Sequence, residues 1–296
     1  MKIIVTGSLG NISKPLTQQL VAQNHDVTVI SHSDKRESEI RNLGAKAAIG
    51  SISDENFLVD TFLGADVVYL MIPSDYKTHD MTADIASTGA TYAAAIEKSG
   101  VKRIVVLSSM GAHLPTGNGP LSALGLAEKN YEKLQGVDIT YLRPGFFYTN
   151  YLAQIGLVNN AGILGDNTSP NTRFLLTHPA DIAEVAADVI LNPTTRKSLR
   201  FIVSDELNNT QIASLLGKSI KKPDLTWVQF SNEDYKNGLM QNGFSESAAR
   251  AYVEMGEAFL DGRAYDEVDT NQDKIVKGKR RFEDFAAEVF APAFSR

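Results

Sequence analysis

Two glycines in the sequence TGSLGNIS at 6–13 stand where a dinucleotide-binding loop would need them. The segment follows an apolar run and opens a stretch of helical periodicity, which is the context that this chemistry requires. Gly7 permits a tight turn, and Gly10 lets the backbone approach a pyrophosphate near the free N–H groups of a helix start. Ser13 replaces a third glycine and is also small. In place of a turn that binds nothing, we expect a cofactor loop formed by Gly7, Ser8, Leu9, Gly10, Asn11 and Ile12.

The residues that follow the second apolar run decide which dinucleotide the loop would hold. An NAD site usually carries Asp or Glu there, about 20 residues past the glycines. This chain has SHSDKR at 31–36, and its hydroxyls and cations suit a 2′-phosphate better than bare ribose hydroxyls. The alternative is a solvated helix that begins at Lys35 and Arg36 and is capped by Asp34. We expect NADP(H) in preference to NAD(H), with contacts from Ser31, His32, Lys35 and Arg36.

Alternating short elements would position these residues. Runs rich in β-formers occupy 2–6, 26–30, 45–49, 66–71, 103–107 and 138–142, and helical periodicity occupies 13–23, 35–43, 55–62, 81–99 and 122–134. Runs such as VVYLMI do not alternate with polar residues, as is typical of strands covered on both faces. The pattern predicts an α/β fold with a doubly wound parallel sheet, the Rossmann arrangement.

The second half of the chain predicts a smaller α+β lobe for substrate. We expect a dinucleotide-binding domain over 1–150 and the lobe over 151–296, with part of 175–205 returning to the first domain. The stretch 150–173, rich in Gly and Asn, predicts loop or a short hairpin. A helix is expected over 179–191, and another over 208–220 capped by Thr210 or Asn209.

Composition excludes several classes of function. The net charge of −6 gives no general electrostatic reason to bind nucleic acid or an anionic membrane. No apolar run approaches the ~20 residues of a membrane span, and no secretory signal pattern is present. The chain has no cysteine, and its five histidines lack metal-ligand spacing. We expect a cytoplasmic protein with a small-molecule substrate and no metal; its oligomeric state stays open.

Five segments in order give the chain a resemblance to a known family. They are IIVTGSLGNIS, GADVVYLMIP, VKRIVVLSSMGA, GVDITYLRPGFFYTN and HPADIAEVAADVI. Together they resemble the NmrA-like group of atypical short-chain dehydrogenases/reductases, and the resemblance extends to the closing FEDFAAEVFAPAF. Each motif is modest, but the order and spacing are specific.

The resemblance implies that the dinucleotide lies along the carboxyl ends of the strands, where the general rule for open α/β sheets also places ligands. By it, Met71, Ile72 and Pro73 line the cofactor, and Ser108 and Ser109 face the nicotinamide. Residues after the sixth strand would close over the ring: Pro144, Gly145 and Phe146. Phe147 would close over the ring with them and adjoin the substrate. Tyr148 and Asn150 either contact the substrate or cap the next helix, and both interpretations stay open.

The catalytic group is harder to find. Many short-chain dehydrogenases use Tyr-x-x-x-Lys, in which the lysine lowers the pKa of the tyrosine. This chain lacks that spacing, since Gly125 lies four residues before Lys129 and Gln135 lies four residues after Tyr131. Lys129 and Tyr131 are nevertheless candidates, against the alternative of an ordinary amphipathic surface helix. His113, in the loop after the fifth strand, is a third candidate proton donor, or simply a polar loop residue.

Three functions fit these features. The first is an NADP(H)-dependent reductase that passes hydride to a small electrophile such as a quinone or an unsaturated carbonyl compound, neither of which strictly needs a tyrosine acid. The second is a redox sensor that binds NAD(P) without turnover and acts through a protein partner. A sugar-nucleotide epimerase or dehydratase is disfavoured, because the tyrosine–lysine pair is missing.

Overall fold

An eight-stranded sheet, parallel at every pairing, forms the centre of the molecule in the structure, a computed structural model that describes residues 1–193 and 196–296. This confirms the predicted doubly wound sheet. In spatial order its strands are β13 (Ile275–Lys277), β10 (Lys197–Val203), β6 (Asp138–Pro144), β5 (Arg103–Leu107), β4 (Val67–Leu70), β1 (Lys2–Val5), β2 (Asp26–Ser31) and β3 (Lys46–Ile49).

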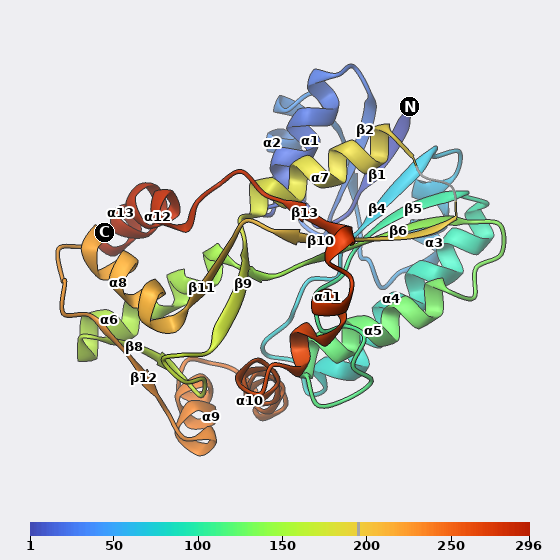
Figure 1. The fold of residues 1–296 in the computed structure, drawn as a ribbon. Helices are drawn as coiled ribbons and strands as arrows, with labels where there is room; N and C mark the ends of the chain where they lie inside the picture. Colours follow the sequence, from blue (N-terminus) through green and yellow to red (C-terminus); the bar gives the residue numbers. More distant parts are fainter. Residues whose placement is uncertain (194–195) are drawn as a thin grey trace.

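Helices cover both faces of this sheet (Figure 1). One face carries α1 (Ser13–Ala22) and α7 (Pro179–Leu191), and the other carries α3 (Glu55–Phe62), α4 (Met81–Ser99) and α5 (Gly119–Tyr131). The short segments η1 (Asp34–Arg36) and α2 (Glu37–Asn42) join β2 to β3. Fully buried Val, Ile and Leu side chains fill both interfaces, because β1, β4 and β5 are apolar on both faces.

The strand order reverses at β1, whose neighbours are β2 on one side and β4 on the other. Chain connections therefore leave β1 and β4 in opposite directions, and a crevice opens at the carboxyl ends of these strands. The β1–α1 turn, the end of β2 and the β4–α4 connection all lie at this carboxyl edge.

The remaining elements form a lobe next to the sheet (Figure 1). Its strands are β7 (Phe146–Phe147), β9 (Arg173–Thr177) and β11 (Asp205–Asn208) in one small sheet, and β8 (Ile163–Asp166) and β12 (Thr226–Gln229) in another. Its helices include η2 (Tyr148–Gln154), α6 (Ile155–Ala161), α8 (Asn209–Ser219), α9 (Asn232–Gln241), α10 (Glu246–Leu260), η3 (Arg263–Tyr265), α11 (Asp266–Thr270), η4 (Gln272–Lys274), α12 (Phe282–Phe285), the π-helical segment η5 (Ala286–Phe290) and α13 (Ala291–Phe294).

The chain passes between sheet and lobe more than once. After β9 it returns to the large sheet through α7 and β10, and β13 later adds the edge strand beside β10. The segment after β13 then crosses back to α12. Its Arg280 pairs with Asp181 of α7, which is buried. The lobe is thus tied to the sheet at several points of the sequence.

Two local predictions were wrong. The stretch 150–173 contains the helices η2 and α6, and β8 within it pairs in parallel with the distant β12 instead of closing a hairpin. Asn208, not Thr210 or Asn209, caps α8: its side chain accepts from the Gln211 N–H, and the Gln211 side chain accepts from the Asn208 N–H. This reciprocal capping box favours the earlier start. Helix α5 also begins three residues before the predicted 122.

Candidate cofactor and substrate site

The turn after β1 has the backbone that the glycine motif predicts. Gly7 and Ser8 both adopt positive φ, +86° and +52°. A Cβ on Gly7 would lie 2.6 Å from Met71 Cγ and 2.7 Å from Ser13 Oγ, so only glycine fits. Ser13 in turn donates its hydroxyl to the carbonyl of Thr6 at 2.8 Å. The serine in the third glycine position therefore fastens the start of α1 to the end of β1.

The first turn of α1 is suited to an anion. Its N-cap, Ile12, provides no side-chain cap, and no acidic residue lies in the first turn. Lys14 donates its N–H to the Gly10 carbonyl at 3.0 Å and Pro15 has no N–H, so a ligand would meet the N–H groups that precede Lys14, where the helix dipole favours negative charge. Gly10 and Asn11 are exposed next to it. These features fit the pyrophosphate of a dinucleotide.

The end of β2 is joined to the turn through hydroxyl groups. Ser8 Oγ donates to Ser31 Oγ at 3.0 Å, and Ser31 is buried. His32 and Lys35 are exposed, whereas Arg36 is paired with Glu39 at 2.8 Å.

Sequence reasoning missed one cation at this corner. Lys14, in the first turn of α1, pairs with the same Glu39 at 2.9 Å. Hydrogen bonds from Lys14 and Arg36 lower the pKa of Glu39. Two cations from different elements therefore converge beside the end of β2. The position of Lys14, directly after the glycine motif, was the signal that could have identified it.

The carboxyl ends of β4 and β5 carry the next predicted contacts. The Thr6 hydroxyl accepts the N–H of Met71 at 2.8 Å, which fastens the end of β4 to that of β1. Ile72 is half-buried, and Pro73 is exposed. After β5, Ser108 Oγ is buried without a hydrogen-bond partner among the residues that the structure describes, and Ser109 is half-buried. An unpartnered buried hydroxyl needs an explanation, and a polar ligand group at this edge would supply one.

The segment after β6 divides between the two parts of the molecule. A Cβ on Gly145 would lie 2.0 Å from the carbonyl oxygen of Leu175, so packing against β9 already requires this glycine, next to buried Pro144. Phe147 packs against the core on the α1 and α7 face of the large sheet. Phe146 belongs instead to an aromatic cluster of the lobe, with ring centroids 5.1–5.9 Å apart, formed with Tyr151, Phe174 and Phe259.

The two further candidates for substrate contact, Tyr148 and Asn150, lie in different surroundings. Tyr148 is fully buried, donates its hydroxyl to the carbonyl of Arg280 at 2.9 Å, and packs edge-on against His178 and Phe282. Its hydrogen bond holds the segment that returns to the lobe, so its observed contacts are structural. Asn150 is exposed on η2.

The catalytic candidates on α5 do not meet. Tyr131 is fully buried between α4, α5 and the sheet, and burial raises its pKa well above the ordinary value. Lys129, two residues earlier, is exposed. Protein encloses the Tyr131 hydroxyl in this packing, and a buried Tyr131 beside an exposed Lys129 agrees with the alternative of an amphipathic surface helix.

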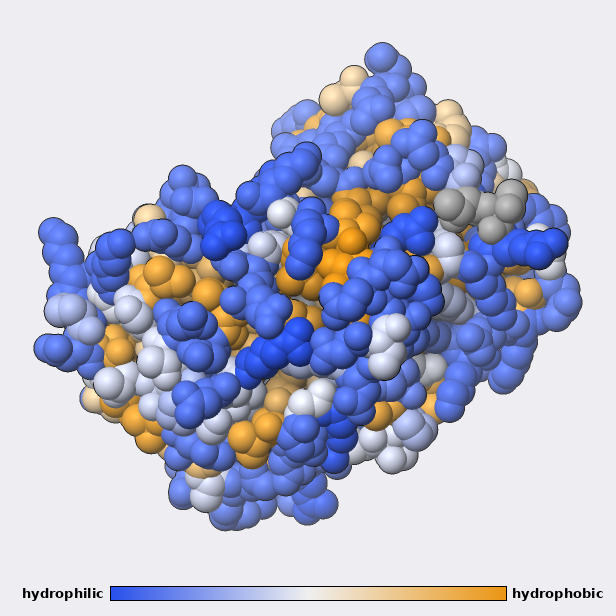
Figure 2. Space-filling view, viewed as in Figure 1, coloured by the Kyte–Doolittle hydropathy of each residue, from blue (hydrophilic) through white to orange (hydrophobic). Residues whose placement is uncertain are grey.

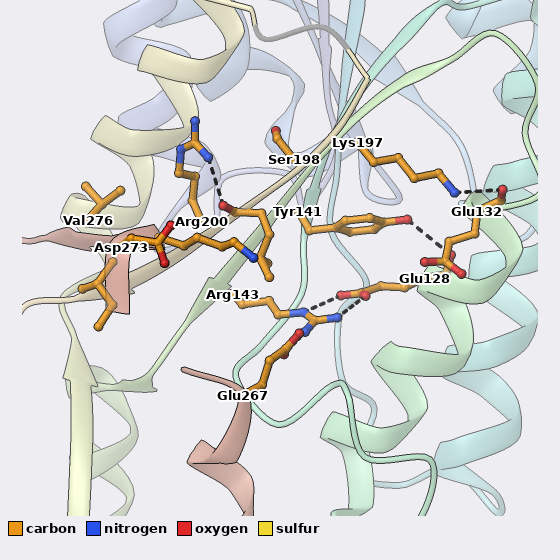
Figure 3. Close-up of a pocket in the computed structure, with 13 residues that line it drawn as sticks. Glu128, Glu132, Tyr141, Arg143, Lys197, Ser198, Arg200, Glu267, Asp273 and Val276 are labelled. Atoms are coloured by element: carbon orange, nitrogen blue, oxygen red, sulfur yellow. Dashed lines mark hydrogen bonds and ion pairs between the residues drawn. The ribbon is translucent and has the colours of Figure 1, made fainter. Parts of the chain in front are cut away.

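His113 lies beside a buried ion-pair network. Its Nδ1 is 3.6 Å from Oε2 of Glu267 on α11. Glu267 also pairs with Arg143 of β6, whose guanidinium forms two hydrogen bonds to Glu128 of α5 (Figure 3). Arg143 is thus shared between two carboxylates, and both ring nitrogens of His113, beside Glu267, are buried without a hydrogen-bond partner among the described residues.

This network borders a hollow of about 760 Å³ (Figure 3). The hollow lies between α5, β6, β10 and the segment from η4 to β13, on the face of the sheet, and its charged lining residues are of both signs. None of the predicted cofactor residues lines it. Because the glycine turn and the strand ends are elsewhere, we do not assign the dinucleotide to this hollow.

A contact between the cofactor edge and the lobe was not predicted. The β4–α4 connection touches α10, where the Ser245 N–H donates to the carbonyl of Tyr76 at 2.8 Å. The Tyr76 ring packs against Phe244 and Tyr252, with centroid distances of 4.7 and 5.8 Å. Its sequence signal was weak, since Tyr76 stands alone in a polar loop. Figure 2 shows one face of the molecule, which is largely hydrophilic, with apolar side chains gathered near its middle.

No helix among residues 1–193 and 196–296 is long and apolar enough to cross a membrane.

Comparisons with known proteins agree with this geometry. The chain is 24% identical over 299 residues to the (4-alkanoyl-5-oxo-2,5-dihydrofuran-3-yl)methyl phosphate reductase of Streptomyces griseus, covering 98% of this chain and 99% of the relative. The fold matches the NADPH-dependent quinone oxidoreductase QOR2 of Escherichia coli, crystallised with NADPH, with a TM-score of 0.80 and 20% identity over 97% and 99% of the two chains. It also matches the negative transcriptional regulator NmrA in complex with NADP, with a TM-score of 0.77 and 15% identity over 99% and 96%.

The model of the NmrA-like family matches residues 1–286, almost the whole chain. The order of the motifs, the glycine turn and the large parallel sheet agree with that match. This protein belongs to the NmrA-like family.

Proposed function

We propose that this protein is an NADP(H)-dependent reductase that transfers a hydride to a small electrophile such as a quinone or an unsaturated carbonyl compound. The observation that carries the proposal is the cradle at the β1–α1 turn, where left-handed Gly7 and Ser8 lead into the uncapped first turn of α1. When bound there, NADPH would supply the hydride. The chain's own residues hold the pyrophosphate at the helix start and hold the ribose near Ser8 and Ser31.

The lobe supports a reductase with an organic substrate. Its aromatic residues lie beside the connections that follow β4 and β6, which are the segments predicted to border the nicotinamide. The resemblance in fold to a quinone oxidoreductase and the sequence relationship to a furanone phosphate reductase support the same substrate class.

Multiple-turnover oxidation of NADPH with a panel of quinones and unsaturated carbonyl compounds tests the proposal. We expect turnover with at least one acceptor class. Gly7→Ala should weaken NADPH binding by about tenfold or more, because the new methyl group meets Met71 and Ser13 at positive φ. Gly64→Ala is the matched control, since Gly64 also has positive φ but no atom lies within 4 Å of the position that its new methyl group would take. No turnover with any acceptor would contradict the proposal.

The preference for NADP(H) rests on the cations beside β2. Arg36→Ala should weaken NADPH binding by about tenfold and leave NADH binding unchanged, because only NADPH carries the 2′-phosphate. Lys14→Ala should act in the same direction. Arg41→Ala is the control, since Arg41 is exposed and pairs with Glu37 of the same helix. Equal losses for both cofactors would contradict this assignment.

The sensor is the second candidate. It is favoured by the environment of two predicted catalytic groups on α5, since Tyr131 is buried and Lys129 is exposed. Tight NADP binding without turnover, together with capture of a protein partner that depends on the dinucleotide, would favour the sensor over the reductase.

A further inference from the structure

Four segments in which the chain passes between the sheet and the lobe meet at one place. His178 connects β9 to α7, Ser204 connects β10 to β11, and the segment after β6 includes Tyr148. The fourth is the crossing segment, residues 278–281, which runs from β13 to α12 (Figure 1). The groups that join these segments therefore help to fix the lobe against the sheet.

Hydrogen bonds link the four segments to one another. The His178 N–H donates to Ser204 Oγ at 2.9 Å, and Ser204 Oγ donates to Asp181 Oδ2 at 2.6 Å. Asp181 also accepts the Arg280 N–H at 3.3 Å and pairs with the Arg280 guanidinium. The Tyr148 hydroxyl donates to the Arg280 carbonyl at 2.9 Å. Residues from all four segments thus belong to one hydrogen-bond network.

His178 takes part in this network as a neutral ring. Its Nδ1 accepts the Ala180 N–H at 3.0 Å, which caps the first turn of α7 directly after Pro179. A ring nitrogen that accepts a hydrogen bond carries no proton, so the one ring proton is on Nε2. Protonation would place a second proton on Nδ1, which would then face the Ala180 N–H as a donor. The cap therefore exists only while His178 is neutral.

The ring of half-buried His178 also lies beside a cation. It packs edge-on against the ring of Tyr148, with 5.5 Å between centroids, and burial raises the pKa of Tyr148, whose hydroxyl stays neutral. Burial and the charge of Arg280 lower the pKa of His178, and the opposing charge of Asp181 offsets them only in part. A protonated His178 would thus be a second positive charge next to Arg280.

The other charged side chains around this network already have partners. Glu184 of α7 pairs with Lys279 and Arg280, each at 2.8 Å, and Arg281 pairs with Asp205 of β11 at 3.5 Å. A proton gained by the histidine therefore meets carboxylates that are paired with cations. Among these groups the imidazole is the one whose type changes charge between pH 5 and pH 8.

We propose that His178 is a pH-sensitive fastening between the sheet and the lobe: the neutral ring caps α7 and lies beside Arg280, and protonation in mildly acidic solution removes the cap, repels Arg280 and loosens the crossing segment. The proposal concerns how the two parts of the molecule are held together, so it does not depend on whether the protein is a reductase or a sensor.

The direction of the effect follows from linkage. Above the ordinary pKa of 6.5 the ring is neutral in the fastened and the loosened state alike, and the fastening is complete. As the pH falls from 6.5 through the lower pKa of the folded protein, the loosened state binds the proton first. The loss therefore begins below pH 6.5 and grows towards pH 5.

Hydrogen exchange of the full chain tests the proposal at the amides concerned. Protection factors, which remove the intrinsic pH dependence of exchange, are compared at pH 7.5 and pH 5 for two places. One is the Ala180 amide at the start of α7, and the other is the crossing segment with the Arg280 amide. In the unaltered protein we expect both protection factors to fall about tenfold at pH 5, since a cap and a contact are lost.

Two variants separate the titration of the ring from its cap. His178→Asn retains a cap acceptor that does not titrate, so both protection factors should be equal at pH 7.5 and pH 5. His178→Ala has no acceptor, so the start of α7 should already be about tenfold less protected at pH 7.5 and should change no further in acid. His79→Asn, at an exposed histidine of the β4–α4 connection, is the matched control and should behave as the unaltered protein.

Three results would overturn the proposal. The first is an unaltered protein whose protection does not change between the two pH values, and the second is a His178→Asn variant that loses protection in acid as the unaltered protein does. The third is a loss confined to the start of α7, because His178 would then cap a helix without fastening the crossing segment.

Discussion

Two regions of this molecule bury acidic groups in opposite ways. Around the hollow of Figure 3, Arg143 lies between Glu128 and Glu267, and Arg143 and Glu128 are less than 10% exposed. In the lobe, the side chain of Asp166 at the end of β8 has only Thr168 as a hydrogen-bond donor among the described residues. Buried Glu128 therefore has a cationic partner, whereas Asp166 has none in the part of the chain that the structure describes.

The difference shows that carboxylates of one protein can be stabilised to very different degrees. A matched ion pair explains its own burial, since each charge replaces the water that the other lost. An acid without a cation lowers the stability of the fold, and a ligand that hydrogen-bonds to it would compensate. The stabilities of the two regions should therefore respond in opposite directions to neutralisation.

Removing Arg143 should have the largest effect. Arg143→Met leaves Glu128 buried and unpaired, and we expect a loss of about 3–5 kcal/mol in the free energy of unfolding. The double change Arg143→Leu with Glu128→Leu should recover most of this loss, because it removes both charges. Urea unfolding of the single and double variants measures both values. A loss below about 1 kcal/mol for Arg143→Met would mean that Glu128 has another source of stabilisation.

Neutralising Asp166 should stabilise the protein. Its pKa is about 6 when folded and near 3.8 when unfolded. Below pH 3.8 both states are protonated and the group has no effect, whereas above pH 6 the folded state bears the cost of the charge. Asp166→Asn keeps an oxygen acceptor for Thr168, so we expect a gain of about 1–3 kcal/mol at pH 8 that disappears by pH 4. Asp224→Asn, at an exposed position of the same lobe, is the control. A loss of stability in Asp166→Asn at pH 8 would contradict the comparison.

The sequence predicts the large sheet and the cofactor turn well, for a physical reason. Strands buried on both faces must be continuously apolar, and a turn with positive φ before a helix needs glycine at Gly7. Both requirements are local and are therefore visible in a short stretch of sequence. All six strands predicted before residue 143 occur within about two residues of their expected bounds.

The lobe was predicted less well because its stability comes from distant pairings. β8 pairs with β12 about sixty residues later, and no short stretch of sequence predicts that pairing. Asp166 lies in a polar stretch and was not predicted as a residue of interest for the same reason. The surroundings of its carboxyl group depend on other elements, α9 and η2. In α5 the amphipathic pattern is local and was visible in the sequence, and Tyr131 lies on its buried face against α4.

A partly exposed pair should give an intermediate result. Asp181 is 2% exposed and Arg280 of the crossing segment is 37% exposed at the side chain. After Arg280→Ala, Asp181 still accepts from Ser204 Oγ at 2.6 Å, so we expect a loss of about 1–2 kcal/mol. Hydrogen bonds from Ser204 and Arg280 outweigh burial and lower the pKa of Asp181, so the group stays ionised down to its ordinary pKa of 3.8 and below. The charge of Arg280 also lowers the pKa of His178 below its ordinary 6.5, after burial, so protonated His178 costs stability at low pH. Removing Arg280 relieves part of that cost, and the loss should therefore be smaller at pH 5 than at pH 7. A loss that grew on going to pH 5 would contradict this reading of the contact.

The smallest effect is expected for an exposed pair, which sets the baseline of the comparison. Lys46 pairs with Asp26 at 2.8 Å across β2 and β3, and both side chains are about half exposed or more. Water solvates these charges almost as well as they solvate each other, so Lys46→Ala should cost less than about 1 kcal/mol, and less still in 1 M salt. Urea unfolding at low and high salt measures this, with Lys277→Ala as a control at an exposed lysine of the opposite edge strand. If this exposed pair proved as important as the buried Arg143 pair, burial would not be what separates the regions.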